Sequence, residues 1–395
     1  MSNHTATAVG GPVFNRTGRL LLFIFLVGLA LVVWRFAVGL GPATGLNDGY
    51  PWGIWIAFEV VTGTALACGG YAMALLVYIF NRGKYHPLVR PALLTSALGY
   101  SIAALAIIID VGRPWLIWRI PISLGKWNLN SALLEVALCV MAYVAVLWIE
   151  MAPAFLDKWK DSLNQGLASF SRGMLKFFDK ALIFIVALGI LLPTMHQSSL
   201  GTVMLLAGPR LHPLWHTPWI PFLFLVSCIS MGYGMVVIES AISSRVFNRQ
   251  REDKMLASLS GAMIFVLLVY VVVRLVDLVL RGRLGLMFSE GVYSLMFWVE
   301  MALFLVPVFM LLSEKARYDI GNLFRAGVLI ALAGTVYRFD SYLVAFRPGQ
   351  GWSYFPTIPE IMISVGLVAL EVLIYLWLVK KFPILSGTKP HAAKA

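Results

Sequence analysis

The stretch LLPTMHQSSL, residues 191–200, places a histidine, a glutamine and two serines at the end of an apolar run. An imidazole such as that of His196 ordinarily titrates near neutral pH, and the amide of Gln197 is a fixed hydrogen-bond donor and acceptor. Two carboxyl groups, Asp110 and Glu135, also lie at the ends of apolar runs. Side chains of these types can exchange protons with a polar group that enters an apolar environment.

The composition indicates what kind of elements position these residues. Of the 395 residues, 60% are hydrophobic and 13% are charged, and the mean hydropathy is +0.83. Such a chain cannot form a water-soluble globule with a polar surface, so we expect an all-α integral membrane protein. Windows of about 20 apolar residues, enough to cross about 30 Å of hydrocarbon, predict about ten transmembrane helices. The expected spans are 19–41, 52–80, 89–111, 130–149, 181–203, 219–242, 257–280, 292–312, 321–345 and 361–381.

The distribution of basic residues predicts the orientation of these spans. Lys and Arg are concentrated in the N-terminal tail, the even-numbered loops and the C-terminal tail, so both termini should be cytoplasmic. The first span is longer than the apolar core of a signal peptide, and further spans follow it, so we expect an uncleaved helix. The net charge of +12 then reflects topology and contact with anionic lipid, and it requires no nucleic-acid partner.

With this orientation, seven polar residues are expected at one level near the outer face. They are Glu59, Asp110, Arg113, Asn130, Glu135, His196 and Gln197. A charged side chain in hydrocarbon costs at least about 2.5 kcal/mol, so these residues should face a protein interior or a cavity. Asp110 and Arg113 are explained equally well by a structural ion pair and by function. We favour a functional role for Glu135 and His196, while for Glu59 the two interpretations are balanced.

The second half of the chain echoes the first. Gly69 and Gly232 lie in similar strings of small residues, and Asp110 recurs as Asp277 at a similar offset. This pattern predicts two four-helix bundles in parallel repeat, with helices 1 and 10 flanking them. The expected segments are 1–51 with helix 1, 52–206 with the first bundle, 207–347 with the second bundle, and 348–395 with helix 10 and the cytoplasmic tail.

The second bundle has an outer polar set of its own. Its members are Arg274, Asp277, Glu300, Arg338 and Asp340. Arg274 and Asp277 are three residues apart on one helix, so we expect them to form a structural ion pair.

Several kinds of redox or metal centre are not supported by the sequence. A haem held by two histidines needs both at membrane depth, and only His196 lies within an expected span. The three cysteines stand singly in different spans, so no iron–sulfur cluster is expected in this chain. His212 and His216 are four residues apart, but Pro213 interrupts a helix and no carboxylate or cysteine is close in the sequence. We therefore interpret this segment as an outer loop and expect no metal site.

Five strings bring a family into view. The chain resembles the HybB-type membrane subunit of respiratory nickel–iron hydrogenases, within the wider NrfD and polysulfide-reductase membrane-subunit family. The strings are, in order, GLNDGYPWGIWIAF, YIFNRGKYHPLVRPALL, IDVGRPW, LLPTMHQSS and YFPTIPE. The resemblance implies a subunit of the bacterial inner membrane that has no redox centre of its own. It implies that a ferredoxin-like iron–sulfur subunit and the small and large hydrogenase subunits lie on the periplasmic side, and that menaquinone or ubiquinone accepts the electrons.

The resemblance also implies a quinone head group in the first bundle near the outer face. Reduction of a quinone takes two electrons and two protons, so titratable groups must reach its carbonyl oxygens. We expect His196 to donate to one carbonyl and Glu135 to relay protons, which allows proton translocation. The other expected quinone-site residues are Trp52, Asp110, Arg113, Asn130 and Gln197; among them, Arg113 would stabilise negative charge on the substrate.

Alternative functions remain at this point. The chain could be the membrane subunit of another NrfD-family oxidoreductase, a passive membrane anchor, or a proton-coupled transporter. A transporter usually has helices broken at the midplane, and an anchor needs no Glu135 or His196 at depth. Family members of the polysulfide-reductase type have eight spans rather than ten, so the resemblance transfers residue roles outside the first bundle only weakly.

Overall fold

The computed structural model describes residues 6–386, which contain helices, turns and a few isolated bridges but no extended strands. Nine helices in this range are long and apolar enough to cross a membrane. They are α1 (Arg16–Val38), the segment Trp55–Ile79, the segment Gly83–Asp110 with α5 (His86–Asp110), α7 (Ala132–Trp159), α9 (Ile220–Val246), α10 (Asp253–Leu280), α12 (Val292–Met310), the segment Ile320–Val344 with α14 (Ile320–Phe339), and α15 (Ile358–Lys381). The remaining expected span lies in α8 (Gln165–Leu206). The prediction of an all-helical membrane protein with about ten spans is confirmed.

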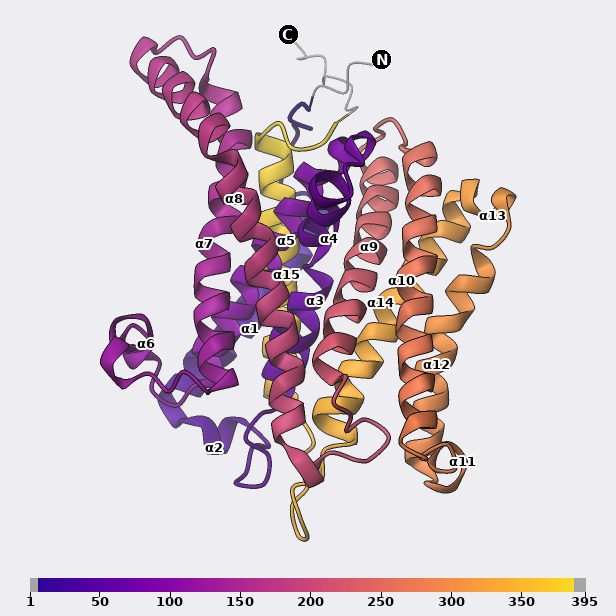
Figure 1. Cartoon of the computed structure of the whole chain (residues 1–395). Coiled ribbons are helices and arrows are strands. Elements are labelled where there is room, and N and C mark those ends of the chain that lie inside the picture. Colours follow the sequence, from indigo (N-terminus) through magenta and orange to yellow (C-terminus); the bar gives the residue numbers. More distant parts are fainter. Residues whose placement is uncertain (1–5, 387–395) are drawn as a thin grey trace.

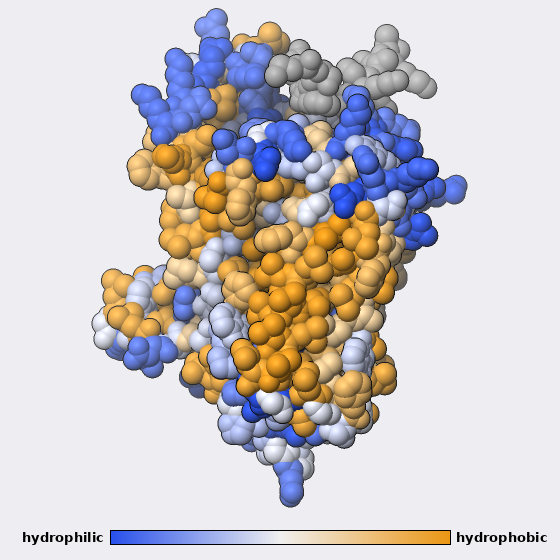
Figure 2. Space-filling view, turned by 45° about the vertical axis from the view of Figure 1, so that its right-hand side comes forward, coloured by the Kyte–Doolittle hydropathy of each residue, from blue (hydrophilic) through white to orange (hydrophobic). Residues whose placement is uncertain are grey.

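The long helices lie side by side (Figure 1). We refer to the segment Trp55–Ile79 with α5, α7 and α8 as the first group, and to α9, α10, α12 and α14 as the second group. Helix α9 also packs against α8 and the segment Trp55–Ile79. Helices α1 and α15 pack against each other beside α5. There a Cβ atom at Gly28 would lie 2.9 Å from the Cα atom of Gly366, so both glycines are needed for the close approach. A broad apolar band separates polar ends on the face shown in Figure 2, as expected for a surface that contacts lipid.

The second span is not a regular α-helix. It consists of η1 (Trp55–Gly63), a π-helix, followed by α3 (Thr64–Leu66), α4 (Gly69–Ala74) and η2 (Leu75–Ile79), a second π-helix. At the break after α3, the Ser96 hydroxyl accepts from the backbone N–H of Gly70 and donates to the carbonyl of Ala67. This side chain supplies partners that the interrupted helix lacks, as irregular backbone at membrane depth requires.

Helix α8 is longer than the expected span 181–203. It begins after Asn164, whose side chain accepts hydrogen bonds from the backbone N–H groups of Gly166 and Leu167. The first turns of α8 and the loop before it project beyond the neighbouring helices (Figure 1). A hydropathy window detects only the apolar part of such a helix, because the projecting turns carry polar side chains.

The loop that precedes η1 is tied to the start of α15 by one carboxylate. Glu360 accepts hydrogen bonds from the backbone N–H groups of Gly45 and Thr357, both at 2.8 Å, and from the Tyr354 hydroxyl at 2.8 Å. The Tyr354 oxygen in turn accepts from the backbone N–H of Ile54 at 2.7 Å. These hydrogen bonds hold together two of the strings that carry the family resemblance, GLNDGYPWGIWIAF and YFPTIPE.

Candidate functional site

His196 and Gln197 are buried in the middle of the helices. The Nε2 atom of His196 lies 3.3 Å from the Thr64 hydroxyl, and the Gln197 amide donates to the same oxygen at 2.9 Å and to the Tyr100 hydroxyl at 3.4 Å. Both residues stand about ten residues before the end of α8 at Leu206, or roughly 15 Å along the helix. They are therefore deeper than the outer level that the sequence suggested.

Arg338 completes this group from the second bundle. Its guanidinium donates to the side-chain oxygen of Gln197 at 3.1 Å, to the Ser227 hydroxyl at 2.9 Å and to the carbonyls of Val61 and Phe224, both at 3.0 Å. A further contact reaches the Met231 sulfur. All of these acceptors are uncharged, although the arginine side chain is completely buried. We call Thr64, Tyr100, His196, Gln197 and Arg338 the central cluster.

One atom of the central cluster has no partner. The Nδ1 atom of His196 is buried and forms no hydrogen bond with the described residues. Buried polar atoms are nearly always hydrogen-bonded, so an unpaired one marks a place for a water molecule or a substrate atom. The other side of the imidazole packs edge-to-face against Tyr100, with ring centroids 5.6 Å apart.

A second polar group lies nearer the outer end of the segment Trp55–Ile79, which also carries Thr64. The carboxyl groups of Glu59 in η1 and Asp110 at the end of α5 interact electrostatically, and Arg35 of α1 faces Asp110. Both oxygens of Glu59, one oxygen of Asp110 and the Ser364 hydroxyl are buried and form no hydrogen bond of ordinary length with the described residues, although Ser364 adjoins Glu59. We call Arg35, Glu59, Asp110 and Ser364 the outer acidic cluster.

The ion pair of Asp110 with Arg113, one of the two interpretations left open by the sequence, does not form. Asp110 faces Arg35, whose guanidinium also donates to the carbonyl of Val111 at 2.8 Å, whereas Arg113 is exposed in the loop after α5. The local spacing misled because α5 ends at Asp110, so Arg113 is no longer on a helix face.

Two further residues expected at the quinone site lie elsewhere. Asn130 is exposed in the loop before α7. The Trp52 indole donates to the carbonyl of Tyr342 at 2.8 Å and packs against Phe346, with ring centroids 4.8 Å apart. Trp52 therefore anchors its loop to the second bundle. Neither Trp52 nor Asn130 forms a hydrogen bond with the side chains of the central cluster.

Glu135 lies in the first turn of α7 and is half-exposed, so the expectation of a desolvated carboxyl level with His196 is wrong. Ser131 caps this helix by accepting from the backbone N–H of Leu134 at 3.3 Å. An acidic side chain in a first turn is favoured by the helix dipole, which explains why Glu135 needs no ion-pair partner.

The polar side chains of α7 nevertheless share one face. Glu135, Cys139, Tyr143 and Glu150 follow at spacings of four, four and seven residues, which bring them to the same side of a helix. Tyr143 packs edge-to-face on Tyr100 with ring centroids 4.6 Å apart, so this face leads to the central cluster. Glu150 interacts electrostatically with Tyr143 and contacts Gly189 of α8.

Sequence reasoning passed over Glu59 and Arg338 as site residues and did not consider Glu150. Glu150 lies directly beyond the expected span 130–149, whereas α7 continues to Trp159. The signal that could have identified these residues is a single charged side chain within an apolar stretch, because such residues in membrane helices usually have a function. Arg338 was assigned to the second bundle alone, and nothing in its local sequence indicated a contact with Gln197.

Part of the second polar set forms a network around Glu300, whereas Arg274 Nη2 and one oxygen of Asp340 are buried without a hydrogen bond to the described residues. Glu300 accepts from Arg274 Nε at 3.3 Å, from the Trp215 indole at 2.8 Å and from the Tyr270 hydroxyl at 2.8 Å. Asp277 pairs instead with Arg281, one turn further along α10, so the expected Arg274–Asp277 pair is wrong. The carboxylate of Glu300 is fully buried and well supplied with donors, which indicates a structural role.

The outer loop between α8 and α9 contains no metal site among the described residues. The fold does bring a carboxylate to His212, contrary to expectation: its Nδ1 atom accepts from the backbone N–H of Leu214, and its Nε2 atom donates to Glu290 at 3.3 Å. The imidazole also stacks on Tyr293, with ring centroids 4.3 Å apart. Burial lowers the pKa of His212 below its ordinary value, and the hydrogen bond to Glu290 opposes this shift only in part.

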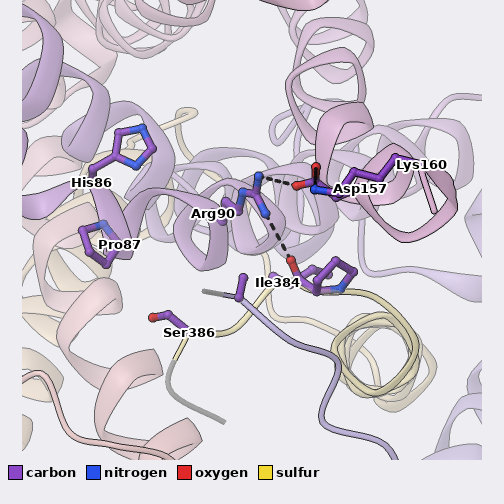
Figure 3. A pocket seen from close by; sticks show the side chains of 9 residues that line it. His86, Pro87, Arg90, Asp157, Lys160, Ile384 and Ser386 are labelled. Atoms are coloured by element: carbon purple, nitrogen blue, oxygen red, sulfur yellow. Dashed lines mark hydrogen bonds and ion pairs between the residues drawn. The ribbon is translucent and has the colours of Figure 1, made fainter. Parts of the chain in front are cut away.

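A cavity of about 540 Å³ opens at the end of the molecule predicted to be cytoplasmic (Figure 3). Arg90 points across it to Asp157 of α7 at 2.7 Å and to the carbonyl of Pro383 at 3.4 Å, while His86 and Lys160 complete the polar lining. Asp157 is seven residues beyond Glu150, or about 10 Å along α7. The cavity therefore gives water access near that end of the α7 polar face.

Comparison with known proteins agrees with this architecture. The family model described as "Polysulphide reductase, NrfD" matches residues 42–345. The chain is 40% identical to the "Probable Ni/Fe-hydrogenase 2 b-type cytochrome subunit" of Escherichia coli K12, over 98% of this chain and 97% of that protein. It is 28% identical to the "Menaquinone reductase, integral membrane subunit" of Nitratidesulfovibrio vulgaris, over 90% and 88%. It is 22% identical to the "Hdr-like menaquinol oxidoreductase integral membrane subunit" of Archaeoglobus fulgidus, over 86% and 87%.

Proposed function

Since this chain belongs to the NrfD polysulphide reductase family, we propose that it is the quinone-reactive membrane subunit of a respiratory nickel–iron hydrogenase complex. In this proposal an iron–sulfur subunit and the small and large hydrogenase subunits dock at the periplasmic face of the bacterial inner membrane. Electrons pass from the iron–sulfur subunit to menaquinone or ubiquinone. The name of the hydrogenase relative supports the assignment to a hydrogenase complex, and the name of the menaquinone reductase relative supports a quinone as the electron acceptor.

The outer acidic cluster is the observation that carries this proposal. A purely structural network would pair its polar atoms, but Glu59, Asp110 and Ser364 keep buried atoms that form no hydrogen bond of ordinary length with the described residues. Carboxyl groups in such surroundings can carry the protons that quinone reduction consumes. Glu59 also lies in a π-helix, a distortion that recurs at functional sites.

We place the quinone head group between the outer acidic cluster and the central cluster. Thr64 is only five residues after Glu59, so a ring between them could reach groups of both clusters. The Thr64 hydroxyl donates to the Val60 carbonyl, so Nε2 of His196 donates to Thr64, and the unpaired Nδ1 atom is an acceptor that fits a hydroxyl of the reduced ring. Glu59 supplies a proton on the outer side. The guanidinium of Arg338, which has no anionic partner among its hydrogen-bond acceptors, favours negative charge that develops on the ring.

The α7 polar face offers a route for protons to this position. Glu150 stands near the cavity predicted to be cytoplasmic, Tyr143 contacts Tyr100, and Glu135 lies at the outer end of the same face. Protons drawn along this route from the cytoplasm to a site that receives electrons from outside would move charge across the membrane, worth about 2.3 kcal/mol per charge at 100 mV. Proton translocation by this route is part of the proposal.

The experiment that tests the proposal compares two hydrogen-driven activities of the purified complex. Reduction of a short-chain quinone requires this subunit, whereas reduction of a soluble viologen dye bypasses it. Glu59→Gln should keep assembly and dye reduction and lose quinone reduction, while the exposed Glu314→Gln should keep all three. Undiminished quinone reduction by Glu59→Gln would remove the cluster from the mechanism. A wild-type complex that reduces the dye but never a quinone would indicate a passive anchor.

A further inference from the structure

A second cavity lies on the lateral face of the molecule, between η2, α9 and α10, and has a volume of about 830 Å³. Its floor is buried and apolar, with Leu76, Val226 and Tyr233 each less than 9% exposed. Its rim is formed by strongly exposed side chains, Ile79 at 61% and Phe265 at 67%. An apolar slot with a buried floor and an exposed rim on a membrane-spanning surface is open to lipid. We call it the lateral groove.

One end of the lateral groove is cationic. After η2 the chain turns through Asn81, which has a φ of 51°, and presents Arg82 and Lys84. Lys84 donates to the Ser258 hydroxyl at 2.6 Å, and the Tyr85 hydroxyl donates to the same oxygen at 2.8 Å. Arg82 and Lys84 are both exposed, and neither forms an ion pair with the described residues. No carboxylate lines the groove.

The dimensions fit one lipid chain. Along α10 the groove extends from Ser258 to Val269, eleven residues or roughly 16 Å, which is about half the thickness of the hydrocarbon core. Its polar end is the one that the distribution of Lys and Arg predicts to face the cytoplasm. The groove therefore begins at a bilayer surface and extends into the hydrocarbon core, along α9 as far as Phe222, as an acyl chain does.

We infer that the lateral groove binds an anionic phospholipid of the cytoplasmic leaflet, with its phosphate at Arg82 and Lys84 and an acyl chain against Val226 and Tyr233. Charge complementarity selects this occupant, because two unpaired cations and two hydroxyl groups face the groove and no anion does. A neutral isoprenoid chain would use the slot but leave both cations without a partner. The bound lipid would fill the space between η2 and α10, and so support the contact between the two bundles from the cytoplasmic side.

The test uses native mass spectrometry of the purified full-length protein in mild detergent, with phosphatidylglycerol or phosphatidylcholine added. Wild type should retain phosphatidylglycerol selectively. A basic residue at an anionic lipid changes binding about fivefold, so Arg82→Gln with Lys84→Gln should weaken it roughly 25-fold. Arg82→Lys with Lys84→Arg should preserve binding. Lys176→Gln with Lys180→Gln removes the same charge from exposed positions on α8 and should have no effect.

A second variant tests the slot without changing charge. Ala262→Phe places a ring in the groove and should also expel phosphatidylglycerol, while the protein remains monodisperse by size exclusion. Equal retention of both lipids by wild type, or full retention by the double Gln variant or by Ala262→Phe, would overturn the inference. Competition by millimolar inorganic phosphate would show recognition of free phosphate instead, and displacement by a long-chain quinone would show an isoprenoid site. Either outcome also refutes the inference.

Discussion

Arg338 of α14 and Gln197 of α8 are joined by a hydrogen bond of 3.1 Å that crosses from one four-helix group to the other. The two residues lie 141 positions apart in the chain. Through Gln197 the guanidinium of the second group reaches Thr64, the hydroxyl that also contacts His196. The geometry around His196 therefore depends on the packing of both groups.

We expect Arg338→Lys to destabilise the protein by about 2–4 kcal/mol. Lysine has three donors on a single nitrogen, so it cannot serve acceptors on both sides of the planar guanidinium, and buried acceptors would lose their partners. The measurement is the apparent Tm of the detergent-purified protein. Arg325→Lys, at an exposed position of the same helix, is the control and should change the Tm little. Equal stability of the two variants would contradict the structural importance of the contact.

His196→Ala should abolish hydrogen-driven quinone reduction while dye reduction persists, because only the membrane reaction needs the imidazole to bind the substrate. His196→Gln keeps a polar side chain and should restore assembly if alanine impairs it, without restoring activity. His216→Ala, in the outer loop, serves as the control. Quinone reduction at the wild-type rate in His196→Gln would show that the imidazole has no part in proton transfer.

Glu135→Gln should keep the complex assembled, since loss of a first-turn carboxylate costs only about 0.3–1 kcal/mol. If the α7 polar face carries protons, this variant should lower quinone reduction or the membrane potential linked to it, and Glu135→Asp should retain part of the activity. Glu150→Gln, at the other end of the face, should reduce the potential as well. Proteoliposomes with a potential-sensitive dye provide the measurement. An undiminished rate and potential in both Gln variants would exclude the route.

Stability should fall as the pH decreases below the ordinary pKa of histidine, about 6.5, and His212 should contribute to this fall. Because burial holds the folded-state pKa of His212 below that of the unfolded chain, the unfolded state binds the proton first. The stabilisation is therefore complete above about pH 6.5 and is lost as the pH falls towards the lowered pKa. His212→Gln should flatten the dependence of Tm on pH between 5 and 7. An identical pH profile in the variant would rule out this contribution.

The purified subunit should show no haem b band after reduction with dithionite. Among the described residues His196 is the only histidine in the interior of a membrane-spanning helix, since His86 stands exposed at the first position of α5. A haem bridging two histidines at membrane depth therefore has no second ligand there. The printed name of the Escherichia coli relative includes a b-type cytochrome, so the measurement is informative for this family. A reduced α-band in stoichiometric amount would contradict the prediction and would require ligands of another kind.

The sequence by itself determined the properties that depend on local composition. Apolar windows predicted eight of the ten spans to within a few residues, because transfer of a helix into hydrocarbon depends mainly on its own side chains. The expected span 130–149 ends ten residues before α7 does. For the same reason the sequence correctly placed His196 and Gln197 inside the membrane domain. The sequence analysis predicted that this span begins at residue 181, whereas α8 begins at Gln165. Its polar turns 165–180 are stabilised by the N-terminal cap and by contacts with α7 rather than by lipid.

Only the tertiary structure decided which polar groups meet. Sequence spacing suggested Asp110–Arg113 and Arg274–Asp277, but in the fold Asp110 interacts electrostatically with Arg35, and Arg274 pairs with Glu300. Neighbours along a helix reach only three or four residues, whereas the rotation and tilt of packed helices bring together side chains that are far apart in the chain. In a low-dielectric interior the closest opposite charge or hydrogen-bond partner prevails wherever it stands in the sequence. For the same reason Arg338 of the second group became part of the site around His196, which no pattern within either half could indicate.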